Sequence, residues 1–151
     1  MPILIPLAAG AIAVVGTILL HGLSVSATVN LFRYKQRSGR AGVSFSADVA
    51  IVAIVMLVLL VAHLIEVAVW ALLFIVCGEF ADFGTAYYHS AVNYTTLGYG
   101  DVIMSPSWRL LGPLEAANGM LMFGVSTAIL FAVLERIVLT RFADLRSAPR
   151  S

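Results

Sequence analysis

Residues 83–101 of the chain read FGTAYYHSAVNYTTLGYGD, and the rest of the sequence is interpreted around this stretch. Its first part, residues 83–96, is rich in aromatic and small residues and contains no Lys, Arg or Glu. It is too short to cross a bilayer, which takes about 20 helical residues. A stretch of this kind is typical of a re-entrant half-helix, and the residues that follow it should face an aqueous path.

The composition places this stretch in a membrane protein. Apolar residues make up 61% of the 151 residues, while charged residues make up 11%, against roughly 25% in ordinary globular proteins. These values exclude a water-soluble monomer and a disordered chain. The net charge of +1 excludes nucleic-acid binding, and one cysteine excludes a disulfide scaffold or a cysteine-based zinc site within one chain.

Three apolar stretches, residues 3–31, 49–76 and 110–139, are each long enough to span a bilayer. The first contains no Asp, Glu, Lys or Arg and is too long for a signal-peptide core, so we expect it to be retained. The segments after the first and third stretches are basic and should lie in the cytoplasm, which predicts an external N-terminus and a cytoplasmic C-terminus. The size and the absence of a targeting peptide suggest a prokaryotic inner membrane. The basic residues are Arg33, Lys35, Arg37 and Arg40 in one segment and Arg141, Arg146 and Arg150 in the other, with Arg136 at the end of the third stretch.

The expected organisation has four parts. They are an outer helix at 1–32, a basic cytoplasmic loop at 33–47, a pore domain at 48–140 and a cytoplasmic tail at 141–151. The pore domain divides into a helix at 48–77, a pore helix at 83–96, a filter at 96–101 and an inner helix at 108–140. The basic loop either holds anionic lipid headgroups or only sets the topology. No span carries regularly repeated arginines, so we expect no voltage sensor.

The residues after the half-helix have the pattern that coordination of a dehydrated cation requires. A potassium ion entering a bilayer exchanges its water shell for oxygens, and backbone carbonyls supply them if all point to one axis. Gly98 and Gly100 tolerate positive φ at alternate positions, which keeps successive carbonyls on one side. Thr96 adds a hydroxyl oxygen, and the ring of Tyr99 can brace the strand. Because this motif occurs once in the chain, a homotetramer is the economical assembly.

The string TTLGYGD at residues 95–101, with its flanking segments, resembles the pore domain of potassium channels, whose signature is usually written TVGYG. Leu97 replaces the common Val or Ile but contributes its carbonyl, so selectivity should survive. The resemblance covers about 90 residues, 49–139. It implies an all-α membrane fold in which two transmembrane helices flank a re-entrant pore helix and filter, with an extra N-terminal helix. The potassium sites it implies are formed by Thr96, Leu97, Gly98 and Tyr99, continuing to Gly100.

The outer mouth departs from the pattern of some family members, which place a carboxylate in the half-helix as a partner for the Asp after the filter. Neither Asn93, three positions before Thr96, nor Val92, four positions before it, is a carboxylate, which leaves the partner of Asp101 open. Tyr88 or His89 could hydrogen-bond Asp101 instead, and the simpler alternative is that Asp101 merely attracts cations. The residues assigned to filter support or the outer mouth are Thr95, Asp101, Tyr88 and Val92.

The third span, by the same resemblance, lines the inner cavity and carries the gate. Gly119 would suit a hinge, although close helix packing explains this glycine equally well, and Gly124 belongs to the same group. Asn118 faces the pore in one interpretation and makes an interhelical hydrogen bond in the other.

His63, Glu66 and Glu115 are ionisable residues of the second and third spans, where charge is costly. His63 and Glu66 share one helical face of the second span, and Glu115 lies in the outer half of the third. We favour a buried, pH-sensitive polar network behind the filter over a metal site. The reason is that HLIE at residues 63–66 lacks the second histidine of HExxH, and no other ligand spacing is present. His21 is interpreted as a packing or interface residue.

The predicted function is passive potassium conduction without catalysis, cofactor or small-molecule substrate, the permeant potassium ions being the only bound metal. A weakly selective cation pore is the alternative if Leu97 and the missing carboxylate loosen the filter. An intramembrane hydrolase or metalloenzyme using His63 and Glu66, with His89 and Glu115, is the alternative from another class. A non-conducting assembly subunit is a third.

Overall fold

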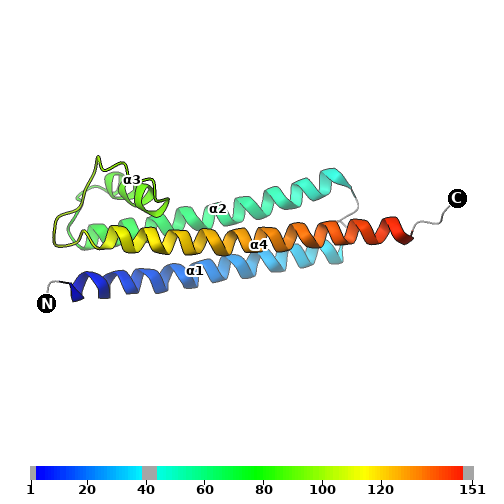
Figure 1. Ribbon diagram of the computed structural model, residues 1–151, viewed down its shortest axis with the longest axis horizontal. Coiled ribbons are helices and arrows are strands. Elements are labelled where there is room, and N and C mark those ends of the chain that lie inside the picture. The colour runs from blue at the N-terminus through cyan, green and yellow to red at the C-terminus, as the bar shows by residue number, and fades with distance from the viewer. Residues whose placement is uncertain (1–2, 39–43, 148–151) are drawn as a thin grey trace. The chain divides into compact units, whose positions relative to one another are not determined.

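The computed structural model of the protein is all-helical and describes residues 3–38 and 44–147, with side chains as far as residue 142. The helices α1, α2 and α4 are long and apolar enough to cross a membrane, so the predicted all-α integral membrane fold is confirmed. The short helix α3 lies between α2 and α4 in the chain (Figure 1). The bounds are α1 Leu4–Arg37, α2 Phe45–Val76, α3 Phe83–Tyr94 and α4 Leu111–Ser147.

The basic segments are more helical than the sequence predicts. The predicted loop at 33–47 is wrong at both ends, because α1 continues to Arg37 and α2 begins at Phe45. The predicted tail at 141–151 is also wrong at its start, because α4 continues to Ser147. Lys and Arg are good helix formers, and positive charge in the last turn of α1 suits the helix dipole. Arg40, Arg150 and the side chain of Arg146 lie outside the described residues.

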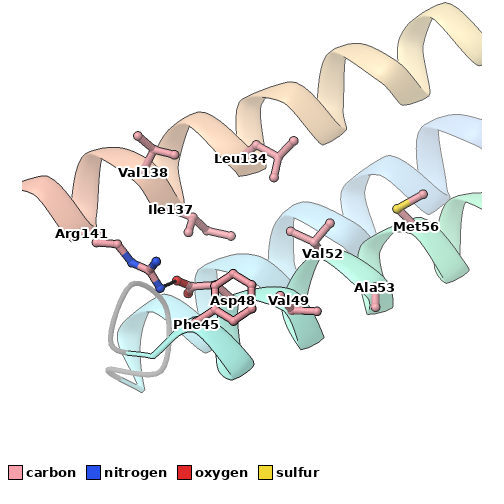
Figure 2. A pocket seen from close by; sticks show the side chains of 10 residues that line it. All are labelled: Phe45, Asp48, Val49, Val52, Ala53, Met56, Leu134, Ile137, Val138 and Arg141. Atoms are coloured by element: carbon pink, nitrogen blue, oxygen red, sulfur yellow. Dashed lines mark hydrogen bonds and ion pairs between the residues drawn. The ribbon is translucent and has the colours of Figure 1, made fainter.

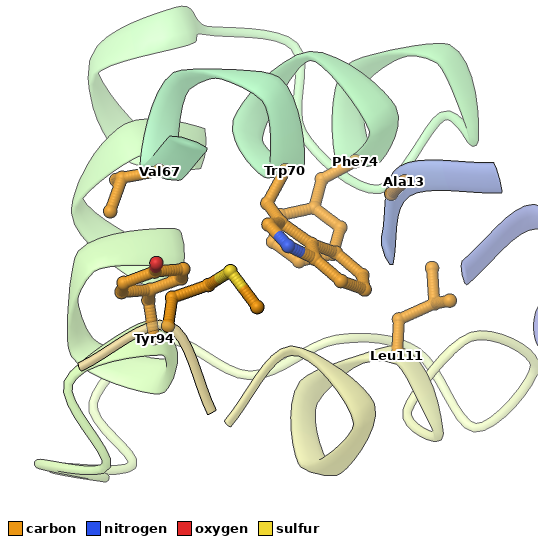
Figure 3. Close-up of a cluster of buried hydrophobic side chains, with 7 residues drawn as sticks. Ala13, Val67, Trp70, Phe74, Tyr94 and Leu111 are labelled. Atoms are coloured by element: carbon orange, nitrogen blue, oxygen red, sulfur yellow. The ribbon is translucent and has the colours of Figure 1, made fainter. Parts of the chain in front are cut away.

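The described residues up to Gly22 and the residues Ala62–Gly124 form one compact unit. Its core combines aromatic and aliphatic side chains from all four helices (Figure 3). Because lipid tails are as apolar as these side chains, the core stabilises the unit through close packing more than through removal from water. The core residues are Ala13, Val67, Trp70, Phe74, Tyr94, Leu111 and Met122.

The helix α3 starts at a well-formed N-cap. Asp82 precedes it with extended backbone, and its carboxylate accepts hydrogen bonds from the backbone N–H of Thr85 at 2.7 Å and from the Thr85 hydroxyl at 3.0 Å. These bonds stabilise the ionised carboxylate and lower the pKa of Asp82. The cap fixes the direction in which the chain leaves the loop after α2.

The helix α3 folds back along α2 instead of standing beyond its end. The Tyr87 hydroxyl donates to the carbonyl of Leu64 at 3.1 Å, and the Ser90 hydroxyl lies 2.8 Å from the carbonyl of Val67. At a rise of about 1.5 Å per residue, these carbonyls lie roughly 14–18 Å before the end of α2 at Val76. Contacts this far inside an apolar span are the geometry expected of a re-entrant segment.

The residues Leu23–Val61 and the described residues from Val125 onward form a second unit. Between α2 and α4 it has an apolar groove of about 440 Å³ (Figure 2). At one end of this groove, Arg141 Nη2 lies 2.6 Å from Asp48 Oδ2, and the Asp48 side chain is only 10% exposed. Arg141 therefore neutralises a nearly buried carboxylate. The core of this unit contains Phe32, Ile51, Val55, Leu59, Val133 and Ile137.

Candidate functional site

The helix α3 ends at Tyr94, so the predicted pore helix at 83–96 is two residues too long. Thr95 is the C-cap and bonds back to the carbonyl of Ala91 through its N–H at 3.1 Å and its hydroxyl at 2.7 Å. Thr96 has a φ of +61°, which a right-handed helix does not allow. The C-terminal end of the α3 dipole, which favours a cation, therefore stands directly at residues 95–101.

The carbonyl of Val92 anchors the first residues after the cap. It accepts hydrogen bonds from the backbone N–H groups of Leu97 at 2.9 Å and of Gly98 at 3.2 Å. These bonds fold the chain back against the last turn of α3. Val92 thus supports the segment through its backbone, which any residue type could supply, while its side chain is buried.

Residues with positive φ occur at every second position of this segment. Thr96, Gly98 and Gly100 have φ values of +61°, +62° and +73°, whereas Leu97 and Tyr99 between them have negative φ. Glycine adopts positive φ at little cost, while a β-branched residue is strained there by about 1–3 kcal/mol. When the sign of φ alternates in this way, successive carbonyls point to the same side of the chain. In an ordinary strand, successive carbonyls point to opposite sides.

The same segment is exposed in the single chain. Leu97 is 54% exposed and Tyr99 is 68% exposed, although both are large apolar side chains. Nothing in the described part of the chain lies within 4 Å of a Cβ built on Gly98 or Gly100. Within one chain most of the Tyr99 side chain is therefore left uncovered.

The C-terminal end of the segment is held by Asp101. The Tyr88 hydroxyl donates to Asp101 Oδ2 at 2.7 Å, and the N–H of Val102 donates to Oδ1 at 3.1 Å. The bond from Tyr88 lowers the pKa of Asp101, and the same bond raises the pKa of Tyr88. Of the two partners that the sequence left open, the structure pairs Tyr88 with Asp101.

His89 instead joins α3 to the chain beyond Asp101. Its Nδ1 lies 2.9 Å from the carbonyl of Val102, which can only accept, so Nδ1 carries the proton. Its Nε2 then accepts from the Asn93 amide at 2.9 Å. Burial lowers the pKa of His89, and the neutral ring is the form that satisfies both neighbours.

The chain beyond Asp101 is held by a further pair of hydrogen bonds, which the sequence did not predict. Ser105 donates to the Glu79 carboxylate through its N–H and its hydroxyl, both at 2.6 Å. The two residues lie on either side of α3 in the chain. No sequence signal distinguishes Glu79 from an ordinary surface acid.

A buried polar cluster joins α1, α2 and α3. His21 Nδ1 lies 2.8 Å from Glu66 Oε1, and His63 Nδ1 lies 3.3 Å from Glu66 Oε2 and 3.1 Å from the Tyr94 hydroxyl. The Tyr94 hydroxyl also donates to Glu66 Oε2. The ring of Phe123 covers His63 with a centroid distance of 4.4 Å. His63 and Glu66 thus contact one another, as expected from the sequence. His21, which was interpreted from the sequence as a packing or interface residue, joins them.

Glu115 of α4 is buried against α3. The Ser90 hydroxyl lies 2.5 Å from Glu115 Oε1 and 2.8 Å from the carbonyl of Val67. Because Ser90 has one proton and Val67 offers only an acceptor, both bonds form together only if Glu115 carries a proton. Glu115 bonds Ser90 and Glu66 bonds Tyr94, so α3 provides a partner for each buried carboxylate.

The comparisons with known proteins identify the family. Residues 58–136 match the family described as Ion channel. The match covers just over half of the 151 residues. The chain belongs to this ion channel family. The matched residues include the second half of α2, all of α3, the segment 95–101 and most of α4. No curated protein and no solved structure matches the chain.

The channel's two predicted hinge glycines differ in their surroundings. A Cβ on Gly119 would fall on the carbonyl oxygen of Tyr94, whereas a Cβ on Gly124 would meet nothing within 4 Å among the described residues. Close packing at Gly119 therefore has a direct structural basis, and its role as a hinge stays a prediction. Asn118 donates to the Thr17 hydroxyl at 2.9 Å, which is the interhelical bond of the two alternatives for that residue.

His21 and Tyr94 are the members of the channel's polar cluster that sequence reasoning missed. His21 is the single ionisable residue in the apolar stretch 3–31, and an ionisable residue at membrane depth is a functional candidate by default. That signal was available. Tyr94 gave no comparable signal, because aromatic residues are common throughout residues 83–101.

Proposed function

We propose that the protein is a potassium-selective channel in which four chains place residues 96–100 around a common axis. The observation that carries the proposal is the alternation of positive φ at Thr96, Gly98 and Gly100 at the C-terminal end of α3. This backbone supports a row of carbonyls on one side, and four such rows supply the oxygens that replace a potassium hydration shell.

The exposure of the segment supports assembly around an axis. Leu97 and Tyr99 leave more than half of their surface uncovered in one chain. A single chain also offers one row of carbonyls, which coordinates an ion from one side only. Four copies would cover the apolar side chains and complete the cage.

The proposal also specifies the bound ion and the orientation of the chain in the membrane. Permeant potassium ions at Thr96, Leu97, Gly98 and Tyr99 are the only ligands it requires. The N-terminus lies outside a prokaryotic inner membrane, and the C-terminus and the basic segment at residues 33–40 lie in the cytoplasm, close to anionic lipids. Membership of an ion channel family favours conduction over catalysis, so the metalloenzyme built on His63 and Glu66 is not proposed.

Reversal potentials of the purified chain in planar bilayers test the selectivity. With potassium on one side and sodium on the other, a potassium-selective filter gives a large shift of the reversal potential. A shift near zero would leave the weakly selective cation pore, and absence of current from tetrameric protein would leave the assembly subunit.

A matched pair of glycine variants tests the role of the segment. Gly98→Ala places a side chain at a φ of +62° and should abolish current while the tetramer persists on native mass spectrometry. Gly16→Ala adds the same methyl group in α1, where nothing among the described residues lies within 4 Å, and should leave the current intact. Equal currents from the two variants would overturn the proposed filter.

A further inference from the structure

The cluster around Glu66 brings together three side chains that bind transition metals. His21 comes from α1, and His63 and Glu66 come from α2. Their ligand atoms all lie within 4.8 Å of one another, and all three residues are buried. The segment HLIE at residues 63–66 lacks the second histidine of HExxH. In the structure a second histidine comes from α1, because His21, 45 positions before Glu66, contacts the Glu66 carboxylate.

We propose that His21, His63 and Glu66 form a binding site for a divalent transition-metal ion of the zinc class. Two imidazoles and one carboxylate form a ligand set that zinc accepts in tetrahedral geometry. Zinc–ligand bonds of about 2.0–2.2 Å place neighbouring ligand atoms roughly 3.3 Å apart. Glu66 Oε1 lies 2.8 Å from His21 Nδ1 and Glu66 Oε2 lies 3.3 Å from His63 Nδ1, so each oxygen of the carboxylate faces one histidine at about this separation.

The fourth ligand position has a candidate as well. The Tyr94 hydroxyl lies 3.1 Å from His63 Nδ1 and donates to Glu66 Oε2, so it stands beside the point where the three ligand atoms converge. The metal-free cluster is held by N–H and O–H groups directed at one carboxylate. A metal ion takes the place of these protons, and each imidazole then carries its proton on Nε2.

The site would give α1 a role in the channel. The family match begins at residue 58, so α1 and His21 lie outside it, while His63, Glu66 and Tyr94 lie within it. A bound ion would tie α1 to α2 beside the last residue of α3, directly before the segment 95–101. The site does not depend on which ion the pore conducts.

Titration of the purified full-length chain in detergent with Co²⁺, after removal of metals with EDTA, tests the site. We expect the visible d–d absorption of tetrahedral Co²⁺, saturating at one ion per chain and lost on addition of Zn²⁺. Absence of this absorption from the wild-type chain would overturn the proposal and leave the cluster as a hydrogen-bonded network. This readout requires no current, so failure of the potassium proposal would not affect it.

The histidines of the chain provide matched variants, since there are three in all. His21→Gln and His63→Gln should each weaken Co²⁺ binding by at least about tenfold. His89→Gln changes the histidine that bonds Val102 and Asn93 and should retain full binding. Equal Co²⁺ affinity in His21→Gln and His89→Gln would contradict the assignment. Circular dichroism and gel-filtration profiles check that each variant is folded, and the wild-type titration decides the question if one is not.

Discussion

The Tyr88 hydroxyl and the Asp101 carboxylate are joined by a hydrogen bond of 2.7 Å at the C-terminal end of the segment that follows α3. Tyr88 lies on α3 and Asp101 lies directly after Gly100, so this bond fixes the end of the segment to the helix that begins it. The backbone conformation of residues 96–100 is thus held at both ends, at one end by the Val92 carbonyl and at the other by Tyr88.

Tyr88→Phe should release the C-terminal end of the segment. The variant removes the donor that lowers the pKa of Asp101, so this pKa should rise toward its ordinary value of 3.8. In potassium currents from planar bilayers we expect shorter openings at unchanged selectivity. Tyr87→Phe is the control, because its hydroxyl bonds the carbonyl of Leu64 instead. Unchanged open times in Tyr88→Phe would show that the bond does not hold the segment.

Gly119→Ala should destabilise the protein. Its methyl group would meet the Tyr94 carbonyl, and overpacking of this kind costs about 1–3 kcal/mol. Gly124→Ala is the matched control on the same helix and should stabilise it by about 0.5–1 kcal/mol, because free space surrounds it and Ala favours a helix. Thermal unfolding in detergent measures both. Equal melting temperatures would argue against the close contact between α3 and α4.

Tyr94→Phe should destabilise the buried cluster. The variant removes a donor from the Glu66 carboxylate, which is fully buried, and leaving such an acceptor under-satisfied costs about 1–3 kcal/mol. Tyr34→Phe removes a hydroxyl from a side chain that is 65% exposed and should have little effect. Chemical unfolding in detergent compares the two variants. A similarly small effect of both would show that the Tyr94 hydroxyl is dispensable.

Acid should weaken the contacts of His89. Burial lowers the pKa of this histidine below its ordinary value of 6.5, so the folded protein favours the neutral ring. Its stabilisation is complete above pH ~6.5 and is lost as the pH falls through the lowered pKa, because a proton on Nε2 opposes the Asn93 amide. Thermal stability of the wild-type chain measured from pH ~8 to ~5 should therefore fall on the acid side.

His89→Gln is the control for this pH dependence. The glutamine amide does not titrate, so the acid-side decrease in stability should be smaller than in the wild-type chain. The decrease contributed by other groups should be the same in both proteins. Identical pH profiles would show that His89 does not contribute.

The sequence by itself determined the membrane class, the three spans and the segment 95–101. The length of each apolar stretch has to match the bilayer, and residues Gly98 and Gly100 permit a backbone that few other residues allow. These are local properties, and each is readable from neighbouring residues. The partner of Asp101 could be narrowed to Tyr88 or His89 for the same reason, because both lie on one short helix.

Only the tertiary structure decided which distant side chains meet. His21 and Glu66 belong to different helices, and the sequence does not determine how α1 is rotated about its axis or its register against α2. The rotation and the register are set by packing, through the core that α1 shares with α2 and through contacts such as the one from Asn118 of α4 to Thr17 of α1. The close approach at Gly119 has the same origin, since it depends on where α3 ends beside α4. The sequence of an apolar helix identifies the membrane as its surroundings, and the packing of its neighbours determines which of its few polar groups find one another.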